Sequence, residues 1–110
     1  MKLIIDDKRV RKLCEDPKHA RKKLGPQVAD KLQRRLQNLF VAESVFDVPP
    51  AFRPHALSGD RDGQFAVDID KANRIVFEAA DEPLPTDDSG GLDGSAVRII
   101  RIVEIGDYHD

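Results

Sequence analysis

The 110-residue chain has one cysteine, one tyrosine and no tryptophan, and it lacks long apolar runs. A single cysteine, Cys14, cannot form an internal disulfide and has no second thiol with which to build a zinc or redox motif. Without a long apolar run the chain has neither a membrane-spanning helix nor a secretory signal at its N-terminus. These absences predict one small domain, spanning residues 1–110, that works in the cytoplasm without a membrane partner.

The sequence also lacks the motifs of the common cofactor-binding folds. It contains no glycine-rich phosphate loop, no Gly-x-Gly-x-x-Gly segment after a strand, no His-Glu-x-x-His pair and no Gly-x-Ser-x-Gly turn. Asp68 and Asp70 would share one face of a strand, but they have no nearby third ligand for a magnesium ion. We therefore expect no cofactor and no metal.

Charge is abundant and unevenly distributed. Basic residues outnumber acidic ones by 12 to 5 in residues 1–40, whereas acidic residues outnumber basic ones by 15 to 6 in residues 41–110. A basic half favours a phosphate-bearing or acidic partner, and an acidic half limits indiscriminate binding to nucleic acid. The alternative is the ordinary preference of helix surfaces for Lys and Arg and of loops for Asp.

Local patterns in the first half predict a short strand followed by helices. Residues 1–5 fit a strand, and two aspartates then offer caps for a helix that begins near Lys8. Pro17 predicts either a kink or a second short helix. From Pro26 onward, apolar residues recur at helical spacing and predict one buried stripe: Val28, Leu32, Leu36, Leu39 and Phe40.

The other side of this last helix is basic. It carries Lys31, Arg34 and Arg35, which form either a platform for RNA or an ordinary solvated face.

The second half has the alternation of strands. Residues 64–70 and 74–78 predict a hairpin, and residues 81–95 a mobile loop. Residues 96–105 are dense in Val and Ile, which indicates a central strand covered on both faces. The whole order predicts an α+β domain in which two N-terminal helices pack on one face of a mainly antiparallel sheet of four or five strands.

Acid–base and phosphate-binding side chains are spread over the C-terminal half. They are His55, Arg61, Arg74, Asp107, Tyr108 and His109. RNA supplies its own nucleophile, the 2′-hydroxyl, so a protein that cuts it must align that oxygen, move two protons and stabilise added charge. Imidazole and guanidinium groups suit these tasks without metal. The alternative for these residues is an exposed terminal histidine and ordinary ion pairs.

Three segments resemble the HigB branch of the RelE/ParE toxin superfamily. They are His55-Ala-Leu-Ser-Gly-Asp-Arg-Asp-Gly-Gln-Phe-Ala-Val-Asp-Ile69, Asn73-Arg-Ile-Val-Phe77 and the closing Asp107-Tyr108-His109. The order of elements and the length extend the resemblance over nearly the whole chain. It implies a RelE-like fold and a ribosome-dependent mRNA endonuclease that inhibits translation.

The resemblance also implies roles for the matching positions. His55 would be a histidine of the cleavage site, and Arg74 the strand arginine that holds phosphate. Tyr108 and His109 would shape the site and transfer protons, and Asp107 would orient them. Arg61 would add a basic contact to RNA.

Partners follow from the same resemblance. A HigA-like antitoxin with a helix-turn-helix domain would neutralise the toxin, the ribosome and mRNA would be its targets, and the pair would bind operator DNA through the antitoxin. One alternative is a toxin-fold binding protein without nuclease activity, such as a ParE-like inhibitor of DNA gyrase. Another is an antitoxin-bound co-repressor.

Two positions depart from the family pattern. Ser58 stands where many relatives have a lysine, and Asp70 stands where an asparagine is frequent. Losing a cation and gaining a carboxylate weakens the attraction for phosphate, so we expect a slow nuclease or one that binds the ribosome and cuts poorly.

Overall fold

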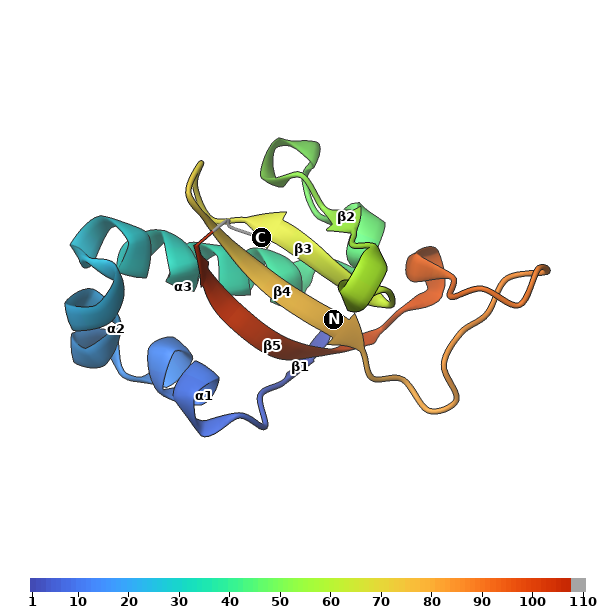
Figure 1. The fold of residues 1–110 in the computed structure, drawn as a ribbon, viewed down its shortest axis with the longest axis horizontal. Coiled ribbons are helices and arrows are strands. Elements are labelled where there is room, and N and C mark those ends of the chain that lie inside the picture. Colours follow the sequence, from blue (N-terminus) through green and yellow to red (C-terminus); the bar gives the residue numbers. More distant parts are fainter. Residues whose placement is uncertain (108–110) are drawn as a thin grey trace.

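The computed structural model describes residues 1–107, and residues 108–110 lie outside the described part of the chain. It has the predicted α+β class, with helices on one face of a five-stranded sheet (Figure 1). The helices are α1 (Lys8–Glu15), α2 (Pro17–Leu24) and α3 (Pro26–Val41). The strands are β1 (Lys2–Ile4), β2 (His55–Ala56), β3 (Gln64–Asp68), β4 (Asn73–Ala79) and β5 (Ile99–Asp107).

Residues 1–107 form three α-helices: the expected fold counted two, with either a kink or a second short helix predicted at Pro17. The Asp7 carboxylate caps α1 by accepting hydrogen bonds from the backbone N–H groups of Arg9, at 2.8 Å, and Val10, at 3.1 Å. Asp16 caps α2 in the same way, so Pro17 begins a separate helix instead of kinking the first. Gly25, at a φ of 86°, then turns the chain into α3.

The strand order is β1-β5-β4-β3-β2. β1 pairs in parallel with β5, and every other pairing is antiparallel. β5 therefore takes the predicted internal position, but it begins at Ile99 because residues 94–96 form a 3₁₀ turn. Burial alternates along β5, with Ile100 and Ile102 buried and Arg101 only half-buried, so one face of this strand is covered and not both.

The core lies between α3 and the sheet. Leu32 and Leu39 of α3 are fully buried there, and the rings of Phe65 and Phe77 stack with centroids 5.8 Å apart. Phe40 was predicted to join this stripe but is 60% exposed. Consecutive helical residues differ by about 100° around the axis, so the core position of Leu39 turns Phe40 outward.

A tight turn joins β3 to β4, whereas residues 42–54 before β2 and residues 80–98 between β4 and β5 form long connections. Asp70 builds the predicted β3–β4 turn, where one carboxylate oxygen accepts hydrogen bonds from the backbone N–H groups of Ala72 and Asn73. Residues 81–95 leave the sheet at the end away from α1 and α2 (Figure 1) and contain one bridge, between Thr86 and Leu92. Among residues 1–107, no helix has the length and apolar character needed to cross a membrane.

Candidate functional site

The strand register places several of the predicted site residues on one face of the sheet. His55 lies opposite Ala66, Ala66 opposite Val76, and Val76 opposite Glu104. Directly opposite residues in antiparallel strands point to the same face. This face lies away from α3, because the intervening residue Phe65 belongs to the core.

A second row of residues crosses the same face two positions further along. Asp68 lies opposite Arg74, and Arg74 lies opposite Gly106. We call the side of the sheet that carries His55, Arg74 and Glu104 the outer face. Two strand spacings and a two-residue offset separate the α-carbons of His55 and Arg74 by about 12 Å, so their side chains can approach one nucleotide from two sides.

The His55 ring is oriented by its own chain. Its Nδ1 lies 2.6 Å from the carbonyl oxygen of Arg53. Because a carbonyl oxygen only accepts hydrogen bonds, this contact places a proton on Nδ1, and in the neutral ring the lone pair is then on Nε2. His55 is half-buried, so the chain presents an imidazole of fixed tautomer at the edge of the outer face.

Arg74 is held within the outer face and is 6% exposed. Asp68 lies opposite it on β3. The Oδ2 atom of Asp68 lies 3.5 Å from Arg53 Nε. Burial among packed neighbours keeps a guanidinium in one position, which is what the fixed binding of a phosphate group requires.

Arg61 reaches the outer face from the connection between β2 and β3. Its Nη2 donates to Glu104 Oε1 at 2.7 Å, and its Nη1 donates to Gln64 Oε1 at 3.0 Å. Since Glu104 is on β5, the Arg61 side chain extends over β3 and β4. The structure thus brings Arg61 to the same face as His55 and Arg74.

The end of β5 lies beside Arg74. Asp107 is directly opposite Asn73, one position beyond the pair formed by Arg74 and Gly106. Alternation along the strand therefore turns Asp107 to the other side of the sheet from Arg74. Tyr108 and His109 follow it in the sequence and lie outside the described residues.

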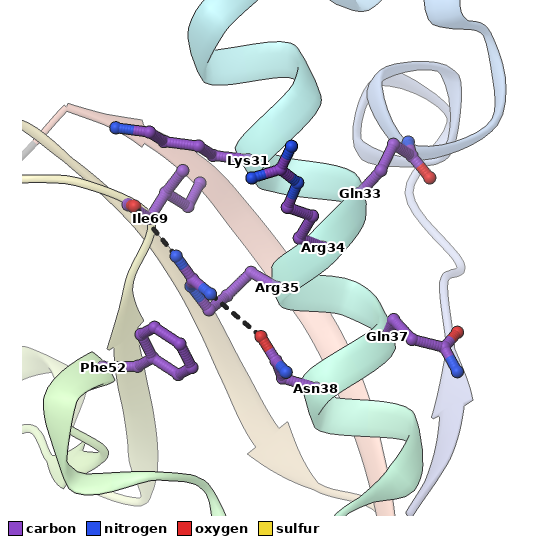
Figure 2. A pocket seen from close by; sticks show the side chains of 8 residues that line it. All are labelled: Lys31, Gln33, Arg34, Arg35, Gln37, Asn38, Phe52 and Ile69. Carbon is purple, nitrogen blue, oxygen red and sulfur yellow. Dashed lines mark hydrogen bonds between the residues drawn. The ribbon is translucent and has the colours of Figure 1, made fainter.

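The three basic residues predicted on α3 lie apart from the outer face, because α3 covers the opposite side of the sheet. Together with Phe52 and Ile69 they line a cleft of about 750 Å³, shown in Figure 2. Lys31 and Arg34 are exposed, and Arg34 Nη2 lies 2.9 Å from Asp30 Oδ2. The predicted RNA-binding set is thus divided between two surfaces.

Arg35 does not lie on a solvated face, as the sequence suggested, but is 8% exposed. It donates to the backbone carbonyl of Asp68 at 2.7 Å. It also donates to the carbonyl of Ile69, at 3.2 Å, and to the Asn38 side chain, at 2.9 Å (Figure 2). Burial lowers the pKa of the Arg35 guanidinium, and the nearby Asp68 carboxylate opposes that shift. The helical spacing could have predicted this burial, because Arg35 is three residues after Leu32 and four before Leu39, on the buried side of the helix.

Three acidic residues of the outer face, Asp68, Glu78 and Glu104, are not among the predicted cleavage-site residues. Glu104 is the one charged residue in the run Ile102-Val-Glu-Ile105 and is half-exposed. The sequence pattern does not single it out, because β5 also carries Arg101 and Asp107, and only the structure shows that it meets Arg61. Among the residues that the structure describes, no group of three His, Cys, Asp or Glu side chains is placed to hold a metal ion.

Comparison with known proteins finds similarity in structure alone. No protein-family model matches the chain, and no curated protein matches it. A YoeB/ParE toxin from Agrobacterium tumefaciens has a similar structure, with a TM-score of 0.55 and 14% identity over 99% of this chain and 100% of that one. The YoeB-YefM complex from Staphylococcus aureus contains another, with a TM-score of 0.59 and 12% identity over 100% of this chain and 98% of that one. The fold of this chain, from first element to last, is therefore the fold of YoeB/ParE-type toxins.

Proposed function

We propose that the chain is the toxin of a type II toxin–antitoxin pair and that it cuts mRNA bound to the ribosome, as the HigB branch of the RelE/ParE superfamily does. The observation that carries the proposal is the shared outer face of His55, Arg61 and Arg74. The fold supports it as well. One of the two similar structures is a YoeB/ParE toxin, and the other comes from a YoeB-YefM complex.

The chemistry proposed is a transfer within the RNA and needs no metal. The 2′-oxygen attacks the adjacent phosphorus, the 5′-oxygen of the next nucleotide leaves, and the products carry a 2′,3′-cyclic phosphate and a 5′-hydroxyl. In this proposal His55 Nε2 exchanges a proton with one of these oxygens, and the contact of Nδ1 with the Arg53 carbonyl supports it by leaving the lone pair of the neutral ring on Nε2. Arg74 stabilises the charge added at phosphorus. Tyr108 and His109 supply the second proton transfer in this proposal, with Asp107 orienting them.

The proposed partners follow from the resemblance to HigB toxins, and the charge distribution supports contact with ribosomal RNA. Residues 1–40 hold the excess of basic residues, and these residues form all three helices. Lys31 and Arg34 are exposed among them and would contact ribosomal RNA, whereas Arg35 would support that surface from within. A HigA-like antitoxin with a helix-turn-helix domain would neutralise the toxin, and operator DNA would be bound through it.

Induced expression in a bacterial host tests the proposal. The wild-type chain should stop growth and leave mRNA cut within open reading frames, with 5′-hydroxyl ends. His55→Ala and Arg74→Lys should remove cutting while the protein remains folded by circular dichroism. His19→Ala on α2 is the matched control, because it removes a histidine far from the outer face. Intact mRNA in cells that make folded wild-type protein would refute the proposal.

A second candidate is a toxin-fold binding protein without nuclease activity. The carboxylates of the outer face favour it, because Asp68, Glu78 and Glu104 each lie beside an arginine and reduce the positive charge available to RNA. DNA damage that depends on gyrase would indicate a ParE-like inhibitor. Normal growth together with repression of the operon would indicate an antitoxin-bound co-repressor.

A further inference from the structure

The ion pair between Arg61 and Glu104 joins the two sides of the outer face. Arg61 belongs to the 3₁₀ turn Gly59–Arg61, and Glu104 lies three strands away from β2, on β5. The two residues are 43 positions apart in the chain. The pair therefore lies across β3 and β4, in the part of the outer face that a strand of RNA would enter between His55 and β5.

In this pair the two terminal nitrogens of the Arg61 guanidinium do not bind the carboxylate together. Glu104 accepts from Nη2 alone, with contacts to both carboxylate oxygens, and Nη1 is given to the neutral Gln64 amide. Arginine binds carboxylate and phosphate most strongly through a fork in which two nitrogens donate in parallel. A phosphate that received both nitrogens would bind Arg61 better than Glu104 and Gln64 together.

The pair is also accessible. The side chain of Arg61 is 36% exposed and that of Glu104 is 43% exposed. Ion pairs this exposed contribute little to folding stability, because water and salt screen them. Breaking the contact therefore costs the protein little, and the released Glu104 carboxylate remains hydrated at the surface.

We infer that Glu104 occupies a phosphate-binding position in the unbound protein and that Arg61 exchanges it for a phosphate of RNA. This inference deepens the proposed function and rests on it for the identity of the ligand. Glu104 acts as an internal competitor, so the free protein binds RNA weakly until other contacts hold the strand on the outer face. Because of this exchange, the affinity for RNA depends on all the contacts of the outer face and not on Arg61 alone.

Binding of a fluorescent 2′-O-methyl oligoribonucleotide tests the exchange, because that probe cannot be cut and reports affinity by anisotropy. Glu104→Gln should lower the dissociation constant on the order of fivefold. This is the largest effect expected from removing the competition of one exposed ion pair. Glu78→Gln is the matched control, since Glu78 also accepts from an arginine, Arg101, at 3.0 Å and faces the same side of the sheet. Removing its charge should change affinity less than about twofold at 0.15 M salt.

The background variant Arg61→Met separates exchange from simple loss of negative charge. In that background, Glu104→Gln should have no larger effect than Glu78→Gln. Equal gains from the two glutamine variants, or a full gain without Arg61, would overturn the inference. Wild-type protein that binds the probe and responds to these variants but leaves ribosome-bound mRNA intact would support the exchange and refute the proposed cleavage.

Discussion

The Arg35 guanidinium carbon lies 3.6 Å from the centroid of the Phe52 ring, so a cation of α3 is stacked on an aromatic residue that precedes the outer-face segment. The same guanidinium binds the carbonyls of Asp68 and Ile69 at the end of β3. Arg35 thus fastens two segments to α3, and these are the segments that lead to His55 and to Arg74. The geometry of the outer face depends on a residue behind the sheet.

Replacing Arg35 by methionine should destabilise the fold by about 2–4 kcal/mol, because two buried carbonyls lose their donor. Chemical unfolding by urea at pH 7 measures the loss. Arg34→Met is the matched control, as it removes the adjacent arginine from an exposed pair with Asp30 and should cost less than about 0.5 kcal/mol. Equal losses in the two variants would contradict the role given to Arg35.

The turn at Asp70 should make stability depend on pH. Burial tends to raise the pKa of this carboxyl, but hydrogen bonds from the Asn73 side chain and from the backbone of Ala72 and Asn73 outweigh it and hold the pKa below 3.8. A lowered pKa stabilises the fold above the unfolded value of 3.8, and the contribution disappears as pH falls through the lower, folded value. Asp70→Asn should therefore be less stable than wild type at pH 7 and equal to it once wild-type Asp70 is protonated. Urea unfolding at several pH values checks this, and a difference that does not depend on pH would contradict it.

Cys14 should be unreactive in the folded protein. Burial, with a smaller contribution from Glu15, raises the pKa of its thiol to about 11. About one molecule in a thousand then carries the thiolate at pH 8, and the thiolate is the form that reacts. Alkylation by iodoacetamide, followed by mass spectrometry, should be slow in buffer and fast in denaturing urea. Rapid alkylation of the folded protein would show that the thiol is not held in the core.

Gly94 should not accept a side chain. A β-carbon at this position would lie 2.5 Å from Cε2 of Phe46, whose ring packs edge-on against Phe65 with centroids 6.1 Å apart. Gly94→Ala should cost about 0.5–1.5 kcal/mol, because the Phe46 ring, which is 53% exposed, must turn away from its position against Phe65.

Gly91→Ala serves as the control for that substitution, because its nearest neighbour would be an oxygen of Asp87 at 3.4 Å. Urea unfolding compares the two variants, and Phe46→Ala should remove most of the difference between them. A Gly94→Ala protein as stable as wild type would show that the ring moves without cost.

Sequence alone predicted much of the fold because its signals are local. The caps at Asp7 and Asp16, the period from Pro26 and the Asp70 turn each depend on neighbours within a few residues, and the structure has all of them. The sequence left open whether Pro17 kinks one helix or begins a second, and the Asp16 cap settles this in favour of a second helix, α2.

The candidate site was less predictable because it depends on register. β2 has two residues, too few for a pattern of alternation, yet its pairing with Ala66 decides which face His55 occupies. Arg35 was misplaced for a different reason: charge was given more weight than helical position, and carbonyl acceptors that no pattern reveals make its burial possible.

The parallel pair of β1 and β5 joins Lys2 to Ile99. On a ribosome, β1 emerges long before β5, the strand with which it pairs. β4 also emerges before β5, which pairs with its other edge. Contacts between residues so distant in sequence form only after both have been synthesised. The sheet is thus completed only after residues 99–107 have left the ribosome, and a nascent chain that has not yet released them lacks the surface on which Glu104 and Arg61 meet.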